Sequence, residues 1–147
     1  MRAEDYISKF GIKPSVQRVA VMKYLLTHKT HPTVEEIYDA LHDEITTLSK
    51  TTIYNTLKLF VEHGAAAQLN IEDKCVHFDG DISAHAHFMC QRCGTIYDIF
   101  PSKMPIIEDF ASLQFGAHNV QNVQLNLTGI CEKCMKNKNK ESKQNKL

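Results

Sequence analysis

The chain has 147 residues, 43% of them hydrophobic, and its 17 Lys or Arg residues balance 17 Asp or Glu residues. This length supports one good core, or two small ones if a metal or a partner chain adds stability. No stretch approaches the ~20 apolar residues of a membrane span, so we expect a cytoplasmic protein. Zero net charge argues weakly against nucleic acid, so a DNA-binding surface would have to gather its basic residues on one face.

The first half of the chain predicts three helices. Ser15 is predicted to cap the first of them, whose apolar residues follow at helical spacing: Val19, Met22 and Leu26. Thr33 and Glu36 form a capping box for the second, which continues with Val34, Ile37, Tyr38 and Leu41. Ser49 caps the third, and His63-Gly64 ends it with a glycine suited to the left-handed conformation. The apolar stripe of this third helix is formed by Ile53, Leu57, Phe60 and Val61.

The opposite face of the third helix has the composition of a recognition helix. It carries Lys50, Thr51, Tyr54, Asn55 and Lys58. Hydroxyl and amide groups read base edges, a tyrosine ring packs on a thymine methyl group, and lysines neutralise phosphates. A solvated helix face is the plain alternative, and residue types alone leave the two even. Short β-prone runs at 66–70 and 75–79 predict a hairpin directly after the helix, which makes residues 1–80 a winged helix-turn-helix domain that commonly binds DNA.

Residues 81–135 predict a small α/β domain, so the whole chain is of the α+β class. We expect strands at 87–89 and 95–100, a helix through Ile106, Phe110 and Leu113, and a third strand marked by Val123, Leu125 and Leu127. A core of this size is marginal alone, so the domain is expected to dimerise. The Lys-rich stretch 136–147 has no apolar residue before the final Leu147 and is predicted to be disordered.

Two CxxC pairs predict a structural zinc site, formed by Cys90 with Cys93 and by Cys131 with Cys134. A zinc ion with four sulfur ligands has no vacancy for imidazole, so the neighbouring His85 and His87 belong to a different site. A thiol redox protein of the thioredoxin kind is a distant alternative, because neither CxxC follows a strand and opens a long helix. Cys75 receives no role, and His77 is expected to be structural or exposed.

Four motifs in this order resemble the ferric uptake regulator family of metal-dependent repressors. They are His31-Pro32-Thr33, Thr52-Ile53-Tyr54-Asn55, His85-Ala86-His87 followed by the first CxxC pair, and the closing CxxC pair. The resemblance runs from about residue 10 to residue 135. It implies a homodimer of winged-helix chains on a palindromic DNA operator, with one structural zinc and one regulatory metal site between the two domains of each chain.

The resemblance also implies which residues bind the regulatory metal. The matching positions are His31, Asp79, His85, His87 and Asp98. Three imidazoles and two carboxylates suit Fe(II) or Mn(II), with one coordination position left open. Because these ligands come from both domains, a bound ion would set the angle between the two winged helices of a dimer.

Within the family, the chain is more similar to the peroxide-responsive repressors than to the iron-responsive ones. An aspartate at the position of Asp98 is typical of the peroxide-responsive repressors. Two other positions supply ligands of a further metal site in many iron sensors, and here they are occupied by Ala86 and Val123, which cannot bind a metal. The resemblance then implies a repressor, not an enzyme, in which peroxide and Fe(II) add oxygen to His31 or His85 and DNA is released. The alternative within the same family is a regulator of iron or zinc homeostasis.

Overall fold

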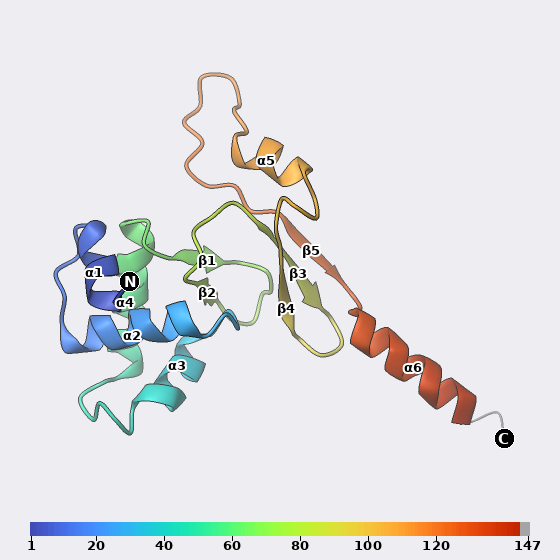
Figure 1. The fold of residues 1–147 in the computed structure, drawn as a ribbon, viewed down its shortest axis with the longest axis horizontal. Helices are drawn as coiled ribbons and strands as arrows, with labels where there is room; N and C mark the ends of the chain where they lie inside the picture. Colours follow the sequence, from blue (N-terminus) through green and yellow to red (C-terminus); the bar gives the residue numbers. More distant parts are fainter. Residues whose placement is uncertain (145–147) are drawn as a thin grey trace. The chain divides into compact units, whose positions relative to one another are not determined.

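The computed structural model describes residues 1–144 and divides the chain into two compact units, Met1–Ser83 and a second that begins at Ala84. Within the described residues, the first unit contains helices α1 to α4 and a short hairpin, and the second contains a small sheet with helices α5 and α6 (Figure 1). None of the helices within the described residues is long and apolar enough to cross a membrane.

The first unit contains the three predicted helices, now α2 (Val16–Thr27), α3 (Val34–Leu41) and α4 (Lys50–Glu62). All three predicted caps are confirmed. The hydroxyl of Ser15 accepts a hydrogen bond from the backbone N–H of Arg18, Thr33 and Glu36 form the full capping box, and Ser49 accepts from Thr52. Each cap satisfies one of the backbone N–H groups left unpaired at a helix start.

A helix that the sequence did not predict precedes these three. It is α1 (Ala3–Lys9), and it buries Ile7 completely. Only seven residues long and without a side-chain cap at Arg2, it gives no clear periodic signal. Its stability comes from packing against α2 in the core of the first unit.

The core of the first unit is built around α2 and α4. On α4 the predicted stripe is confirmed at Ile53, Leu57 and Phe60, which are fully buried. On α2 the prediction needs correction, because the buried residues besides Met22 are Val21 and Leu25, whereas the expected Val19 and Leu26 are only half-buried. Apolar residues cover more than one face of α2, so spacing alone could not select the buried one.

A hairpin follows α4, as predicted, and completes a winged-helix arrangement. Gly64 ends the helix at φ 73°, and β1 (Ala67–Leu69) then pairs antiparallel with β2 (His77–Asp79). We call β1, β2 and the connecting residues 70–76 the wing. Its second strand is tied to the segment before α3, because the backbone N–H of Phe78 donates to the carbonyl of Pro32 at 3.0 Å.

The second unit is a three-stranded sheet in the order β4-β3-β5. The central strand β3 (Ala86–Cys90) pairs antiparallel with β4 (Ile96–Ile99) and parallel with β5 (Asn126–Gly129), and α5 (Ile106–Ala111) lies between β4 and β5 in the sequence. The last strand begins later than predicted, although the carbonyl of Leu125 still accepts a hydrogen bond from the N–H of His87. Leu113 falls outside α5.

The structure differs from the sequence prediction at the Lys-rich tail. Helix α6 spans Glu132–Gln144, so the part of the expected disordered stretch up to residue 144 is helical, and residues 145–147 lie outside the described part of the chain. Lys, Glu and Gln are good helix formers, and Lys136 pairs with Glu132 one turn earlier. The low hydrophobicity of this stretch correctly indicated that it has no core of its own. The helix propensity of its residues accounts for the helical conformation.

Candidate DNA-binding surface and metal sites

All five residues predicted to contact DNA lie on the exposed side of α4. Lys50, Thr51, Asn55 and Lys58 are exposed, and so is Tyr54, at 52% of its surface. The exposed face therefore has the chemistry of a recognition helix, and its contact with DNA stays a prediction.

One of these five residues has a partner inside the first unit. The Lys50 ammonium forms an ion pair with Glu35 on α3 and lies 5.4 Å from the centre of the Tyr38 ring. The pair raises the pKa of Lys50, chiefly through the hydrogen bond to Glu35. An exposed ion pair is weak, so a phosphate can replace Glu35 at little cost.

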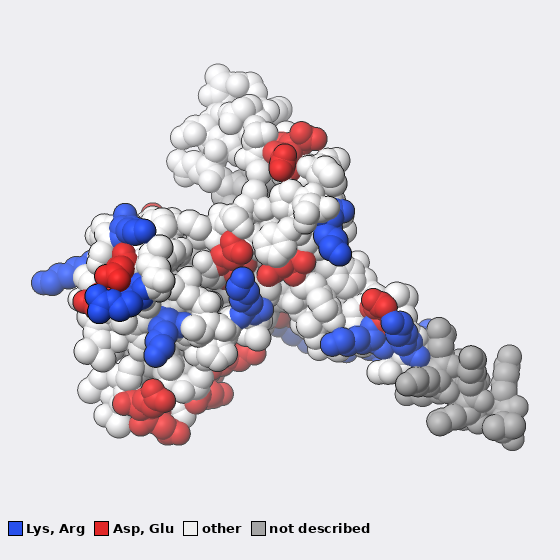
Figure 2. Space-filling model, viewed as in Figure 1, with Lys and Arg blue, Asp and Glu red and all other residues white. Residues whose placement is uncertain are grey.

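The sequence reasoning missed two basic residues beside the recognition face. A groove next to Asn55 is lined by Lys13, which precedes α2, and by Arg18 in its first turn, and the Arg18 guanidinium donates to the carbonyl of Lys13 at 2.8 Å. The sequence could have indicated them, because both basic residues flank the predicted helix cap at Ser15. Figure 2 shows basic and acidic side chains together on the face of the first unit in view, with acidic side chains gathered at its lower end.

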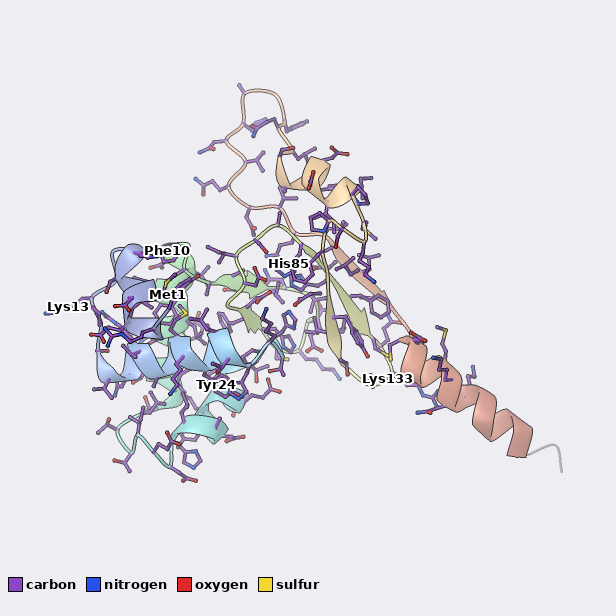
Figure 3. The ribbon with its side chains drawn as sticks, in the orientation of Figure 1. Met1, Phe10, Lys13, Tyr24, His85 and Lys133 are labelled. Atoms are coloured by element: carbon purple, nitrogen blue, oxygen red, sulfur yellow. The ribbon has the colours of Figure 1, made fainter. Side chains whose placement is uncertain are left out.

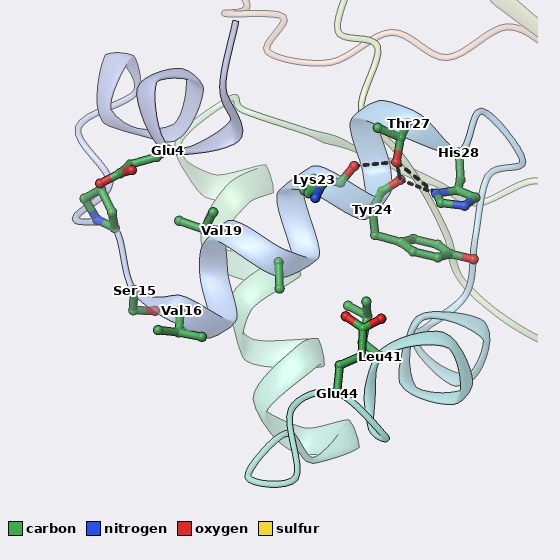
Figure 4. A pocket seen from close by; sticks show the side chains of 12 residues that line it. Glu4, Ser15, Val16, Val19, Lys23, Tyr24, Thr27, His28, Leu41 and Glu44 are labelled. Atoms are coloured by element: carbon green, nitrogen blue, oxygen red, sulfur yellow. Dashed lines mark hydrogen bonds between the residues drawn. The ribbon is translucent and has the colours of Figure 1, made fainter.

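A second groove of the first unit does not coincide with any predicted site. It runs beside α2 and is shown in Figure 4. Apolar side chains such as Val16, Val19 and Leu41 line it, with Glu4 and Glu44 at its edges. None of the predicted DNA-binding or metal-binding residues is among the twelve that line it.

The four predicted zinc ligands come together in the second unit. Cys90 ends β3, Cys93 lies in the following turn, Cys131 follows β5 and Cys134 lies in the first turn of α6. The expectation that neither CxxC follows a strand and opens a long helix is therefore wrong for the second pair. The parallel pairing of β3 with β5 aligns Cys90 with Gly129, which brings the two CxxC pairs to the same end of the sheet. Their sulfur atoms all lie within 4.8 Å of one another.

The surroundings of two of these sulfurs, those of Cys90 and Cys131, favour the thiolate. The backbone N–H of Cys131 donates to Cys90 Sγ at 3.3 Å, and this bond, with another from Cys93, lowers the pKa of Cys90 to about 6. Hydrogen bonding to Cys131 instead raises the pKa of Cys134. A divalent cation that binds four such sulfurs displaces their protons. The four-sulfur donor set fits a structural zinc ion.

In the first unit, two of the predicted regulatory ligands are adjacent. His31 Nε2 lies 3.5 Å from Asp79 Oδ2. The other carboxylate oxygen of Asp79 accepts the backbone N–H of Asp81 at 2.8 Å, which fixes the carboxylate orientation. His31 has a φ of 54°, a conformation that few residues other than glycine adopt. The wing and the residues before α3 thus supply one imidazole and one carboxylate.

In the second unit, the other three predicted ligands are adjacent. Asp98 faces His87 across β3 and β4, and Asp98 Oδ1 lies 3.5 Å from the Nε2 atoms of both His85 and His87. Figure 3 labels His85, whose ring packs on Phe100 with the ring centres 5.2 Å apart. Two imidazoles and one carboxylate are the protein ligands of many non-haem Fe(II) sites.

Ala86 and Val123, the two residues that cannot bind a further metal ion, differ in their surroundings. Ala86 is fully buried and is the first residue of β3, directly after His85. Val123 lines a small apolar groove together with His85 and Phe110. Neither methyl-bearing side chain offers a donor atom to a second ion.

Comparison with known proteins identifies the family. The model of the ferric uptake regulator family matches residues 9–129. The peroxide operon regulator of Bacillus subtilis (strain 168) is 32% identical over 137 residues, which are 93% of this chain and 94% of that protein. The peroxide-responsive repressor PerR of Staphylococcus aureus (strain Mu50 / ATCC 700699) is 34% identical over 124 residues, 84% of this chain and 83% of that protein. The chain belongs to the ferric uptake regulator family.

Solved structures agree on the fold. The Campylobacter jejuni peroxide stress regulator has a TM-score of 0.68 and 26% identity, covering 91% of this chain and all (100%) of that one. The ferric uptake regulator from Pseudomonas aeruginosa with manganese has a TM-score of 0.70 at 20% identity, covering 90% of this chain and 99% of that one. The predicted α+β class is confirmed.

Proposed function

We propose that this chain is a metal-dependent transcriptional repressor that responds to hydrogen peroxide. The observation that carries the proposal is the Asp98 carboxylate, which faces His85 and His87 in the manner of an Fe(II) site. The names of the Bacillus and Staphylococcus relatives, which describe peroxide-responsive regulators, point to the same function. Such a regulator works on DNA in the cytoplasm and is not an enzyme.

The DNA-binding part of the proposal rests on α4. Tyr54 and Asn55 would contact base edges in the major groove, and Lys58 would contact a phosphate, with Thr51 and Lys50 beside them. Lys13 and Arg18 extend the positive charge along the start of α2. A homodimer presents two such helices, which suits a palindromic operator.

The sensing part of the proposal requires one ion to join the two units. Neither half has enough ligands alone, since the first unit supplies His31 and Asp79 and the second supplies His85, His87 and Asp98. Five ligands with an open sixth position suit Fe(II) or Mn(II). An ion held by both units would restrict the hinge between them and so favour one spacing of the two recognition helices in a dimer.

The response to peroxide would follow from the ligands themselves. Bound Fe(II) would activate hydrogen peroxide, so that one oxygen atom goes to a ligand ring and the other leaves as water. His31 and His85 are the expected acceptors of an oxygen atom, and an oxidised ring is a poorer ligand. Loss of a ligand weakens metal binding, which releases the hinge and then the DNA.

The proposal is tested by selecting an operator from random DNA with Mn(II)-loaded protein and then adding dilute peroxide. Fe(II)-loaded protein should release the operator, and peptides with His31 or His85 should gain one oxygen atom, whereas Mn(II)-loaded protein should remain bound. If metal supply alone controls operator binding and peroxide has no effect on iron-loaded protein, the chain is instead a metal homeostasis regulator of the same family. Peroxide-dependent release with oxidation confined to cysteines would support thiol-based sensing.

A further inference from the structure

Three side chains that ligate metals converge in the wing, apart from the sites described above. They are Glu72, Cys75 and His77. Glu72 Oε1 lies 2.9 Å from Cys75 Sγ and 2.6 Å from His77 Nε2. The distance from Cys75 Sγ to His77 Nε2 is 3.5 Å. A carboxylate oxygen, a sulfur and an imidazole nitrogen therefore meet at one point, within six residues of sequence.

The His77 ring is held in the orientation of a metal ligand. Its Nδ1 lies 2.7 Å from the backbone carbonyl of His31, and a carbonyl can only accept, so Nδ1 carries the proton. In the neutral ring Nε2 then directs its lone pair toward Glu72 and Cys75. A bond from the distal ring nitrogen to a backbone carbonyl is the usual way in which proteins orient histidine ligands.

Glu72 and His77 are close enough to share one cation. Glu72 Oε1 lies 2.6 Å from His77 Nε2, where a carboxylate oxygen and an imidazole nitrogen can bind the same ion. Because Cys75 is exposed, an ion can reach the three ligands from solvent.

We propose that the wing binds one Zn²⁺ ion through Glu72, Cys75 and His77, with water as the fourth ligand. Zinc takes this mixture of sulfur, nitrogen and oxygen ligands in tetrahedral sites, and three protein ligands plus water are typical of open zinc sites. Zinc bonds of ~2.0 to 2.3 Å place ligand atoms about 3.3 to 3.7 Å apart. The distance from sulfur to nitrogen already fits, and the Glu72 carboxylate has to withdraw by roughly 0.7 Å.

A reactive redox thiol is the competing explanation for Cys75, and its surroundings disfavour it. The hydrogen bond to Glu72, followed by burial, raises the pKa of Cys75 to about 11. The thiol is therefore protonated at neutral pH, and a protonated thiol is a poor nucleophile. A bound cation reverses this effect, because zinc stabilises the thiolate and the Cys75 proton passes to solvent as the zinc–sulfur bond forms.

Cobalt spectroscopy on the full-length protein with its four-cysteine zinc retained tests this site. The proposed regulatory ligands contain no sulfur, so a near-ultraviolet sulfur-to-cobalt charge-transfer band would come from Cys75 alone. The wild-type protein should bind two equivalents of Co²⁺ and show this band, and one equivalent of Zn²⁺ should abolish it. Metal analysis of the protein confirms that the original zinc ion is still bound.

Variants separate this site from the regulatory one. Cys75→Ser should lose the band and one equivalent of Co²⁺, and Glu72→Gln should weaken zinc binding at least tenfold. His87→Ala should lose one equivalent but keep the band, and Asp73→Asn, in the same turn, should behave as the wild type. Absence of the band from the wild-type protein, or its persistence in Cys75→Ser, would overturn the proposal. These outcomes do not depend on peroxide sensing or DNA binding.

Discussion

His87 and Asp98 are paired directly across β3 and β4, and His87 Nε2 lies 3.5 Å from Asp98 Oδ1. His85 Nε2 lies at the same distance from that oxygen. The strand register sets the pairing of His87 with Asp98, because opposing residues of an antiparallel pair project their side chains to the same face, and His85 lies just before β3. The length of the side chain at position 98 therefore controls where the carboxylate meets the two imidazoles.

Lengthening this side chain should uncouple peroxide sensing from metal binding. In Asp98→Glu the carboxylate remains a ligand but moves by about one methylene, and misplacement of that size lowers reactivity on the order of 10- to 100-fold. Peroxide-dependent oxidation of His31 and His85, followed by peptide mass mapping, should fall accordingly, while metal-dependent DNA binding persists. Asp109→Glu, on the exposed side of α5, is the matched control. A variant as sensitive as the parent would remove the reason for preferring peroxide over iron sensing.

Base recognition is assigned to Tyr54 and Asn55. Replacing either with alanine should weaken operator binding by roughly 1 to 3 kcal/mol for each lost base contact. Tyr54→Phe keeps the ring and should retain any contact with a thymine methyl group. Titration of a labelled operator measures these effects, and unchanged affinity in Tyr54→Ala would show that α4 is not the recognition helix.

The two lysines of α4 should behave differently. Lys58→Ala should weaken binding to all sequences alike and reduce the slope of log affinity against log salt by about 0.9, the value for one lost phosphate contact. Lys50 must first leave Glu35, so Lys50→Ala should have the smaller effect. Glu35→Gln should raise affinity, because it frees Lys50 and removes a negative charge. Equal slopes for wild type and Lys58→Ala would contradict the phosphate contact.

Removing zinc should unfold the second unit. Structural zinc contributes its binding free energy to folding, so a strong chelator should abolish the sheet signal of this unit and expose four thiols to alkylation. The cysteines that respond, identified by mass mapping, should include Cys90, Cys93, Cys131 and Cys134. Rapid alkylation of all four before chelation would mean that they do not hold a metal.

The stability of the first unit should depend on the capping box of α3. Thr33→Ala removes the acceptor for the Glu36 N–H and should lower the free energy of unfolding by about 1 kcal/mol. Thr30→Ala, at an exposed bend just before the helix, should change it little. Chemical denaturation of zinc-loaded protein compares the two variants, and equal stabilities would contradict the role of the cap.

Local signals in the sequence were sufficient for the caps, the wing and the zinc ligands. Capping at Ser15, Thr33 and Ser49 depends on residues three positions apart, which can be read without tertiary structure. The buried face of α2 could not be read in this way, because neighbouring elements select which apolar residues are covered.

Relationships between distant residues were beyond the sequence. The ion pair between Lys50 and Glu35 joins two helices, and the approach of Lys13 to Asn55 depends on how α2 crosses α4. The wing cluster was missed for another reason. Cys75 and His77 each have an ordinary structural explanation alone, and only the conformation of the turn brings them to Glu72.

The central claim is that ligands from both units share one regulatory ion, and Mn²⁺ stoichiometry on zinc-loaded protein tests it most directly. The account predicts one tightly bound Mn²⁺ per wild-type chain and none in either His31→Ala or His87→Ala, because each variant removes a ligand of the same ion. Two ions in the wild type, with one remaining in each variant, would contradict it, since the two halves would then bind metal independently.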